Sequence, residues 1–249
     1  MGSRQRRGEG QSKQPTLTPG AAGARQPAAL AAILGCTAVL GWAGLRADAA
    51  WHDFAATTIM ENVLQADASD PAGLDAAAVH IDRALARFPR HADYLDLAGQ
   101  LKTLRARQPG VVGRERREWL EAAAADHRRA LAERPAWPYG WAALLSVKDA
   151  LGQADAEFVN AMHRATETGP WEPRVQLQVF RSGIRYWDEL GSQERELIRR
   201  VSVAALQVQP REAFEIARFY ARPDLVCGVA PDQPQIERWC TSVSAQEPH

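Results

Sequence analysis

Four prolines divide the middle of the chain at similar distances, and each one has an alanine five residues before it. The pairs are Ala84 with Pro89, Ala130 with Pro135, Ala165 with Pro170, and Ala205 with Pro210. The prolines lie 35 to 46 residues apart, which is the length of a helical hairpin with small insertions. A single hairpin cannot bury its own apolar face, so repeated hairpins stack and share a core. The spacing therefore predicts a stack of paired helices.

Further patterns favour an all-α fold. Three of the prolines begin related strings, which are Pro135-Ala-Trp-Pro138, Pro170-Trp-Glu-Pro173 and Pro89-Arg-His-Ala92. Alanine is abundant, 46% of the residues are hydrophobic, and β-branched residues are sparse. Helical periodicity and the capping and breaking residues predict helices over Trp51–Ala66, Pro71–Phe88, His91–Arg107, Arg116–Glu133, Pro138–Leu151, Asp155–Thr168, Pro173–Leu190, Ser192–Val208 and Glu212–Ala221.

The amino-terminal part of the chain differs from the rest. Residues 1–27 are rich in Gly, Gln, Ser, Pro and Arg, which predicts a disordered basic tail. Residues 28–45 carry no charge and lie between Arg25 and Arg46. A helix of roughly 18 to 20 apolar residues crosses the hydrocarbon core of a membrane. We therefore predict a transmembrane anchor at 28–45, with the basic amino terminus in the cytoplasm and a repeat domain of residues 50–222 outside it.

Two other interpretations of residues 28–45 remain open. A cleaved signal peptide is one, because Ala47-Asp48-Ala49 has the small residues of a cleavage site. A buried core helix is the other, although the segment has no polar face. The anchor and the signal peptide both predict that the repeat domain is exported.

The carboxyl-terminal residues 223–249 are predicted to be irregular. Cys227 and Cys240 lie in this stretch. In an oxidising compartment we expect a disulfide between them that holds the loop, with a contribution of about 2–3 kcal/mol. Two unrelated buried thiols are the alternative.

The hairpin spacing resembles that of tetratricopeptide repeats. The family's small residue, proline and following large residues have counterparts in Ala130, Pro135, Trp141 and Leu144, and Gly99 fits its glycine position. The resemblance implies a tetratricopeptide-like α-solenoid of helical hairpins, preceded here by one transmembrane helix. Such stacks present extended surfaces that bind other chains.

A narrower resemblance covers about residues 80–190. Arg134–Leu144, followed by Gly152, Asp155–Phe158 and Gly169–Pro173, resembles VpsP-type accessory proteins of bacterial polysaccharide biosynthesis. Those proteins are small, membrane-anchored and repeat-containing, and they are associated with exopolysaccharide loci. The resemblance implies a single-pass protein of the bacterial inner membrane with a periplasmic repeat domain. It implies no catalytic residue.

Four aromatic residues form a candidate binding surface. They are Trp137, Tyr139, Trp171 and Trp187. Aromatic rings stack on sugar faces and anchor bound peptides, so a partner groove or a saccharide site is the functional interpretation. The alternative is that the rings fill gaps between hairpins.

No catalytic motif is recognisable, and we expect neither enzyme activity nor a cofactor or metal. No two of the six histidines have the His-x-x-x-His spacing of a metal site. Lys plus Arg and Asp plus Glu number 30 each, which disfavours a nucleic-acid partner. The predicted function is a scaffold that binds envelope or polysaccharide-assembly proteins. A periplasmic saccharide-binding module that uses exposed tryptophans is the alternative.

Overall fold

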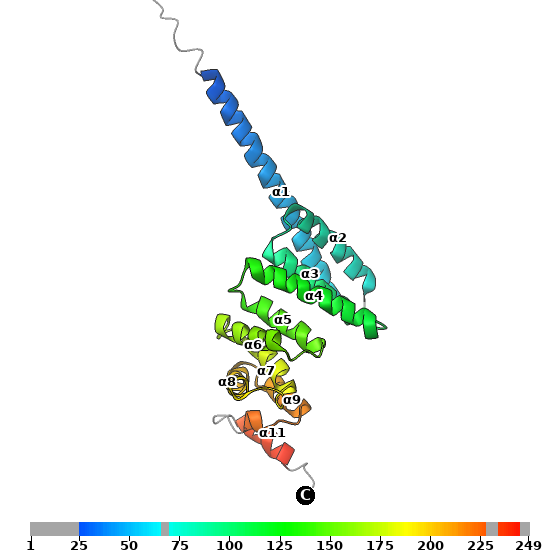
Figure 1. Ribbon diagram of the computed structural model, residues 1–249, viewed down its shortest axis with the longest axis vertical. Helices are drawn as coiled ribbons and strands as arrows, with labels where there is room; N and C mark the ends of the chain where they lie inside the picture. Colours follow the sequence, from blue (N-terminus) through cyan, green and yellow to red (C-terminus); the bar gives the residue numbers. More distant parts are fainter. Residues whose placement is uncertain (1–24, 66–69, 228–233, 245–249) are drawn as a thin grey trace, which may run out of the picture. The chain divides into compact units, whose positions relative to one another are not determined.

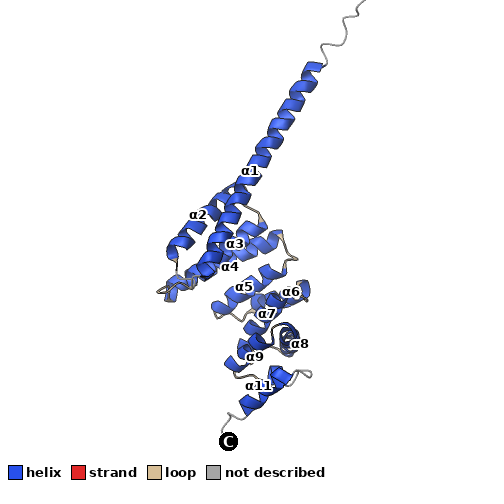
Figure 2. Ribbon diagram, turned by 180° about the vertical axis from the view of Figure 1, so that it is seen from behind, coloured by secondary structure: helices blue, strands red, loops and turns tan. Residues whose placement is uncertain are grey.

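A computed structural model of the chain describes residues 25–65, 70–227 and 234–244. These residues form helices and connecting turns, with no strand among them, so the all-α prediction is confirmed for the described part (Figure 2). The chain divides into one unit of residues Met1–Arg46 and a second of Ala47–His249. The helices are α1 Arg25–Gln65, α2 Pro71–Arg87, α3 Ala92–Ala106, α4 Gly113–Glu133, α5 Pro138–Ala150, α6 Ala156–Thr168, α7 Pro173–Arg185, α8 Ser192–Val208, α9 Pro210–Phe219, α10 Asp224–Cys227 and α11 Pro234–Ser244.

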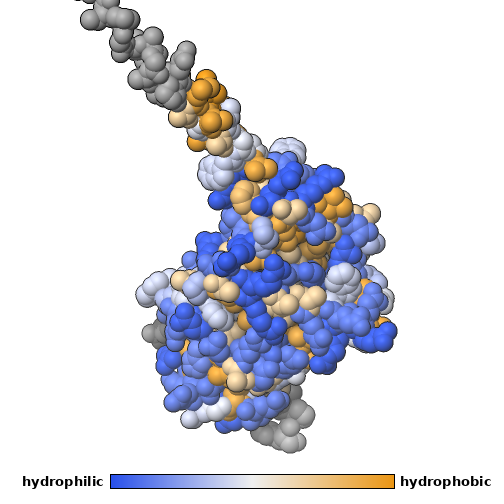
Figure 3. Space-filling view, turned by 45° about the horizontal axis from the view of Figure 1, so that its top comes forward, coloured by the Kyte–Doolittle hydropathy of each residue, from blue (hydrophilic) through white to orange (hydrophobic). Residues whose placement is uncertain are grey.

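The first unit contains the apolar part of α1. This helix is long and apolar enough to cross a membrane. Its apolar side chains are exposed, and Figure 3 shows them as apolar surface on the rod-like helix. Of the predicted basic tail, residues 1–24 lie outside the described residues, and residues 25–27 already belong to the helix.

Helix α1 continues into the second unit without the expected break between the anchor and the first repeat helix. The reason lies between Leu45 and Trp51, where the chain contains no proline or glycine and is mostly alanine, the strongest helix former. Beyond this point Ala56, Met60 and Val63 are buried and pack with side chains of α2 and α3.

The helices of the second unit pack mainly against their neighbours in the sequence. Helix α3 packs on α4, α5 on α6 and α7 on α8, and the first helices of these pairs also contact one another in the series α3, α5, α7 and α9. Figure 1 shows the pairs following one another in chain order. One core cluster extends from the end of α3 through the later helices and includes the fully buried rings of Phe158 and Phe180, whereas most buried apolar residues of α3 pack in a separate cluster with α1 and α2.

The residues before the four prolines share one backbone geometry. Their φ angles lie between −132° and −141° and their ψ angles between 54° and 78°. Each amide donates a hydrogen bond of 2.7–3.0 Å to the carbonyl of the alanine four residues earlier. These residues are Phe88, Arg134, Gly169 and Gln209, and their acceptors are Ala84, Ala130, Ala165 and Ala205. All four alanines are at most 2% exposed. The recurring sequence pattern is therefore a recurring structure.

Proline explains this geometry. Its ring pushes the preceding residue out of the α region, so the helix ends there while that residue's amide closes the last turn. After three of the prolines, a short turn leads to the next helix, which begins at Ala92, Pro138 or Pro173. The fourth junction is shorter, because α9 begins at Pro210 itself.

The structure corrects two predicted boundaries. Helix α7 ends at Arg185 rather than Leu190, and residues 186–190 form turns. The prediction that residues 223–249 are irregular is wrong for the described part, since α10 and α11 lie there. Pro234 occupies the start of α11, a position at which proline favours a helix. A disulfide joins Cys227 of α10 to Cys240 of α11, with 5.7 Å between the Cα atoms.

The residues that follow α5 and α9 both have a left-handed backbone conformation, but only one of them is a glycine. Beyond α5, Gly152 has φ +70°, and its amide and that of Gln153 bond back to Asp149 and Lys148. Beyond α9, Ala221 has φ +54° and occupies the same place in the same bonding pattern. Glycine adopts this left-handed conformation freely, whereas an alanine side chain is strained in it.

We therefore expect Ala221→Gly to raise the free energy of unfolding by about 0.5–1 kcal/mol and Gly152→Ala to lower it by about 1 kcal/mol. A Cβ at position 152 would meet no atom within 4 Å, so the second change tests backbone strain alone. Urea unfolding of the two variants, followed by circular dichroism, measures both effects. A stability loss in Ala221→Gly would contradict the assignment of that helix end.

Candidate functional site

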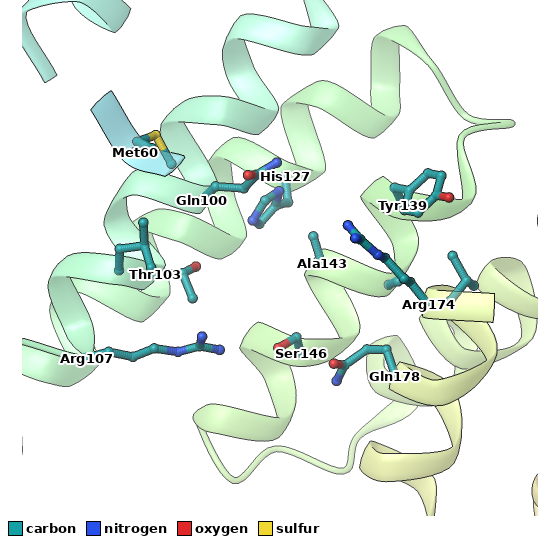
Figure 4. A pocket seen from close by; sticks show the side chains of 13 residues that line it. Met60, Gln100, Thr103, Arg107, His127, Tyr139, Ala143, Ser146, Arg174 and Gln178 are labelled. Atoms are coloured by element: carbon teal, nitrogen blue, oxygen red, sulfur yellow. The ribbon is translucent and has the colours of Figure 1, made fainter. Parts of the chain in front are cut away.

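The candidate site is a cavity of about 320 Å³ on the face that α3, α5 and α7 share (Figure 4). Met60 of α1 and His127 of α4 complete its wall. The residues that line it are Met60, Gln100, Thr103, Leu104, Arg107, His127, Tyr139, Ala142, Ala143, Ser146, Arg174, Val175 and Gln178.

Most of the lining on α5 and α7 comes from equivalent positions of consecutive hairpins. These side chains lie four, eight or eleven residues after the junction proline, which is the spacing of one helix face. They are Tyr139, Ala143 and Ser146 on α5, and Arg174 and Gln178 on α7. The junctions therefore set which side chains reach the cavity.

Two arginines give the cavity its charge. Figure 4 shows Arg107 extending from α3 and Arg174 from α7 toward the space between these helices. Neither guanidinium makes a hydrogen bond or an ion pair within the described part of the chain, and none of the described residues that line the cavity is acidic. The pKa of Arg107 is lowered by surrounding protein and then by the nearby charges of Arg116 and Arg181. The cavity is thus electropositive.

The other end of the cavity has a buried polar pair. His127 Nδ1 lies 2.8 Å from Asp96 Oδ1, and the amide of Gln100 donates to Asp96 Oδ2 at 2.7 Å. A Cβ at Gly99 would come within 2.7 Å of the His127 ring, so the glycine makes room for it. Asp96 is buried, and among the described residues no hydrogen bond or ion pair joins its carboxylate to Arg107 or Arg174.

The face continues past α7 with the opposite charge. A second hollow of about 390 Å³ lies between α7 and α9 and is lined by Arg181, Glu212, Glu215, Ile216, Phe219 and Tyr220. Arg181 lies eleven residues after Pro170, the position that Ser146 has on α5. The electropositive part of the face is therefore limited to the region around α3, α5 and α7.

The aromatic residues predicted as one binding surface have different environments. Trp171 is 91% exposed. Tyr139 is also exposed and lines the cavity, and its hydroxyl donates a hydrogen bond to Glu172. Trp137 is half-buried and stacks with the guanidinium of Arg134 at 4.5 Å.

The prediction that Trp187 belongs to a binding surface is wrong. This side chain is only 6% exposed. Three guanidinium groups, those of Arg195, Arg199 and Arg222, lie 4.5–5.8 Å from its ring centroid. The early end of α7 explains the difference, because Trp187 lies in the turn before α8 rather than on an exposed helix face.

Sequence reasoning missed the residues that give the cavity its chemistry. Arg107, Arg174, Ser146 and Gln178 belong to no known motif, and in the sequence they look like ordinary polar residues of a helix. The available signal was their distance from the junction prolines, which places three of them on one face.

Comparison of the chain with protein-family models, with curated proteins and with solved structures gives no match. Among the residues that the structure describes, no three His, Cys, Asp or Glu side chains are grouped as metal ligands. The features that bear on function are therefore the shape, the charge and the position of the cavity.

The different environments of Trp187 and Trp171 predict a large loss of stability for one alanine variant and almost none for the other. Trp187→Ala removes a buried ring and should lower the free energy of unfolding by about 3–5 kcal/mol. Trp171→Ala removes an exposed ring and should change it by about 0.5 kcal/mol or less. Chemical denaturation of the two variants measures the contrast. Equal losses would contradict the burial that the structure assigns to Trp187.

Proposed function

We propose that the chain is a non-catalytic, membrane-anchored scaffold that binds protein partners with the face shared by α3, α5, α7 and α9. The observation that carries this proposal is the cavity, since its lining comes from three consecutive first helices rather than from one local loop. A surface built in this way can hold an extended or helical segment along several hairpins.

A tetratricopeptide-like solenoid is the fold that we propose for the second unit. Pairing of α3 with α4, α5 with α6 and α7 with α8 supports it, as does the contact between successive first helices. The shared geometry of the proline junctions supports it further, because a repeated joint turns each pair in a similar way onto the next.

We propose that the apolar part of α1 is a single-pass anchor and that the second unit is periplasmic. The basic residues before the apolar segment support a cytoplasmic amino terminus. The disulfide between Cys227 and Cys240 supports an oxidising compartment for the domain. Together with the resemblance to VpsP-type proteins, these features favour a role in exopolysaccharide synthesis or export at the bacterial inner membrane.

A saccharide-binding module is the second candidate, and the exposure of Trp171 favours it. An exposed ring at a turn can stack on a sugar. This candidate differs from the first because oligosaccharide should bind to the purified protein without a partner, and Trp171→Ala should weaken that binding in calorimetry.

Site-specific photo-crosslinking in the native membrane tests the scaffold. A photoreactive phenylalanine in place of Tyr139 should form adducts with an envelope protein, because this residue lines the cavity. The same group in place of Arg200 is the control, since that residue is exposed on α8 and does not line the cavity. The absence of any protein adduct from position 139, and from position 143 beside it, would contradict the proposal.

A further inference from the structure

The cavity combines positive charge with an apolar floor. Arg107, which follows the last residue of α3, and Arg174 of α7 extend toward it (Figure 4), and Leu104, Ala142 and Val175 are buried apolar residues of its lining. The chain as a whole has equal numbers of acidic and basic side chains, so an acid-free cavity with two arginines is a local departure from its average composition.

We propose that this cavity binds an acidic segment of a partner protein, in which carboxylates on either side of an apolar residue pair with Arg107 and Arg174. This inference rests on the proposed function and names the site and the chemistry of its partner. An arginine can donate two parallel hydrogen bonds to one carboxylate, which gives such a pair both strength and orientation.

The two arginines are available to a ligand. In the described part of the chain neither of them donates to a carboxylate or carbonyl, whereas arginines elsewhere, such as Arg128 with Glu157, are paired. The charges that act most strongly on Arg107 are those of Arg116 and Arg181, which are also cations. A bound carboxylate would offset this repulsion. The repulsion therefore favours occupation by an anion.

The lining also indicates the class of the anion. Ser146 lies on α5 between the two arginines and makes no hydrogen bond with another described residue, so its hydroxyl is free to bond to a peptide group. Ala142 and Ala143 beside it are small enough for a backbone to approach. The apolar lining residues are aliphatic, and the hydroxyl of Tyr139, the one phenol ring among the described lining residues, is held by Glu172. Sugars commonly stack on an open aromatic face, and the described lining has only the Tyr139 ring and the buried His127 imidazole, so a peptide with an apolar side chain suits it better than a sugar does.

Selection from a phage-displayed library of random heptapeptides on the full chain in nanodiscs tests the proposal. We expect the enriched pool to contain peptides with two or more Asp or Glu residues around an apolar residue. A synthetic peptide from that pool should bind at least roughly tenfold more weakly to the double variant Arg107→Gln with Arg174→Gln. Its affinity for Arg200→Gln should be unchanged. A pool without acidic enrichment, or equal affinity for all three proteins, would overturn the proposal.

Two further measurements complete the test. The affinity of the wild-type protein should fall as salt is raised, which requires no variant to fold, and a salt-independent affinity would count against charge pairing. If oligogalacturonate is bound instead, and no acidic peptide is enriched, the ligand is an anionic saccharide and the proposal fails. A protein adduct at position 139 together with a pool lacking acidic residues would leave the scaffold standing and remove this inference.

Discussion

The four proline junctions in the described part of the chain share one hydrogen bond, from the amide before the proline to the carbonyl of a buried alanine. The proline prevents the helix from continuing, and the bond holds the last turn closed at the point where the chain leaves it. The alanine is small and fully enclosed, so the neighbouring helix can lie close to the same turn. The bond therefore fixes where one hairpin ends, and with it where the first helix of the next hairpin begins.

The junctions also determine what the molecule presents to a ligand. Once a junction fixes the start of α5 or α7, the residues four, eight and eleven positions after its proline lie on one face. Around α3, α5 and α7 the outcome is a small, electropositive cavity with an aliphatic floor, and near α9 it is a hollow with two glutamates.

The sequence was sufficient for the features that depend on local chemistry. Proline and alanine predicted the carboxyl-terminal ends of α2, α4 and α6 to within one residue, because their effects act within one turn. The continuity of α1 past Leu45 also depends on local chemistry, because three of the five residues before Trp51 are alanines, which favour a helix.

Other features depend on contacts between distant residues. The sequence did not predict the burial of Trp187, which lies between arginines contributed by α8 and by the segment before α10. The predicted irregular carboxyl terminus instead contains α11, which begins at Pro234. The charge of the cavity could not be seen either, since Arg107 and Arg174 come from two different hairpins.

Hydrogen exchange of the backbone amides in the full chain tests the central role of the junctions most directly. The amides of Phe88, Arg134, Gly169 and Gln209 should exchange at least roughly a hundredfold more slowly than in an unstructured peptide, because each is bonded to a buried carbonyl. The amide of Trp171, which makes no such bond among the described residues, should exchange fast and serves as the internal reference. Fast exchange at the four residues before the prolines would contradict the account.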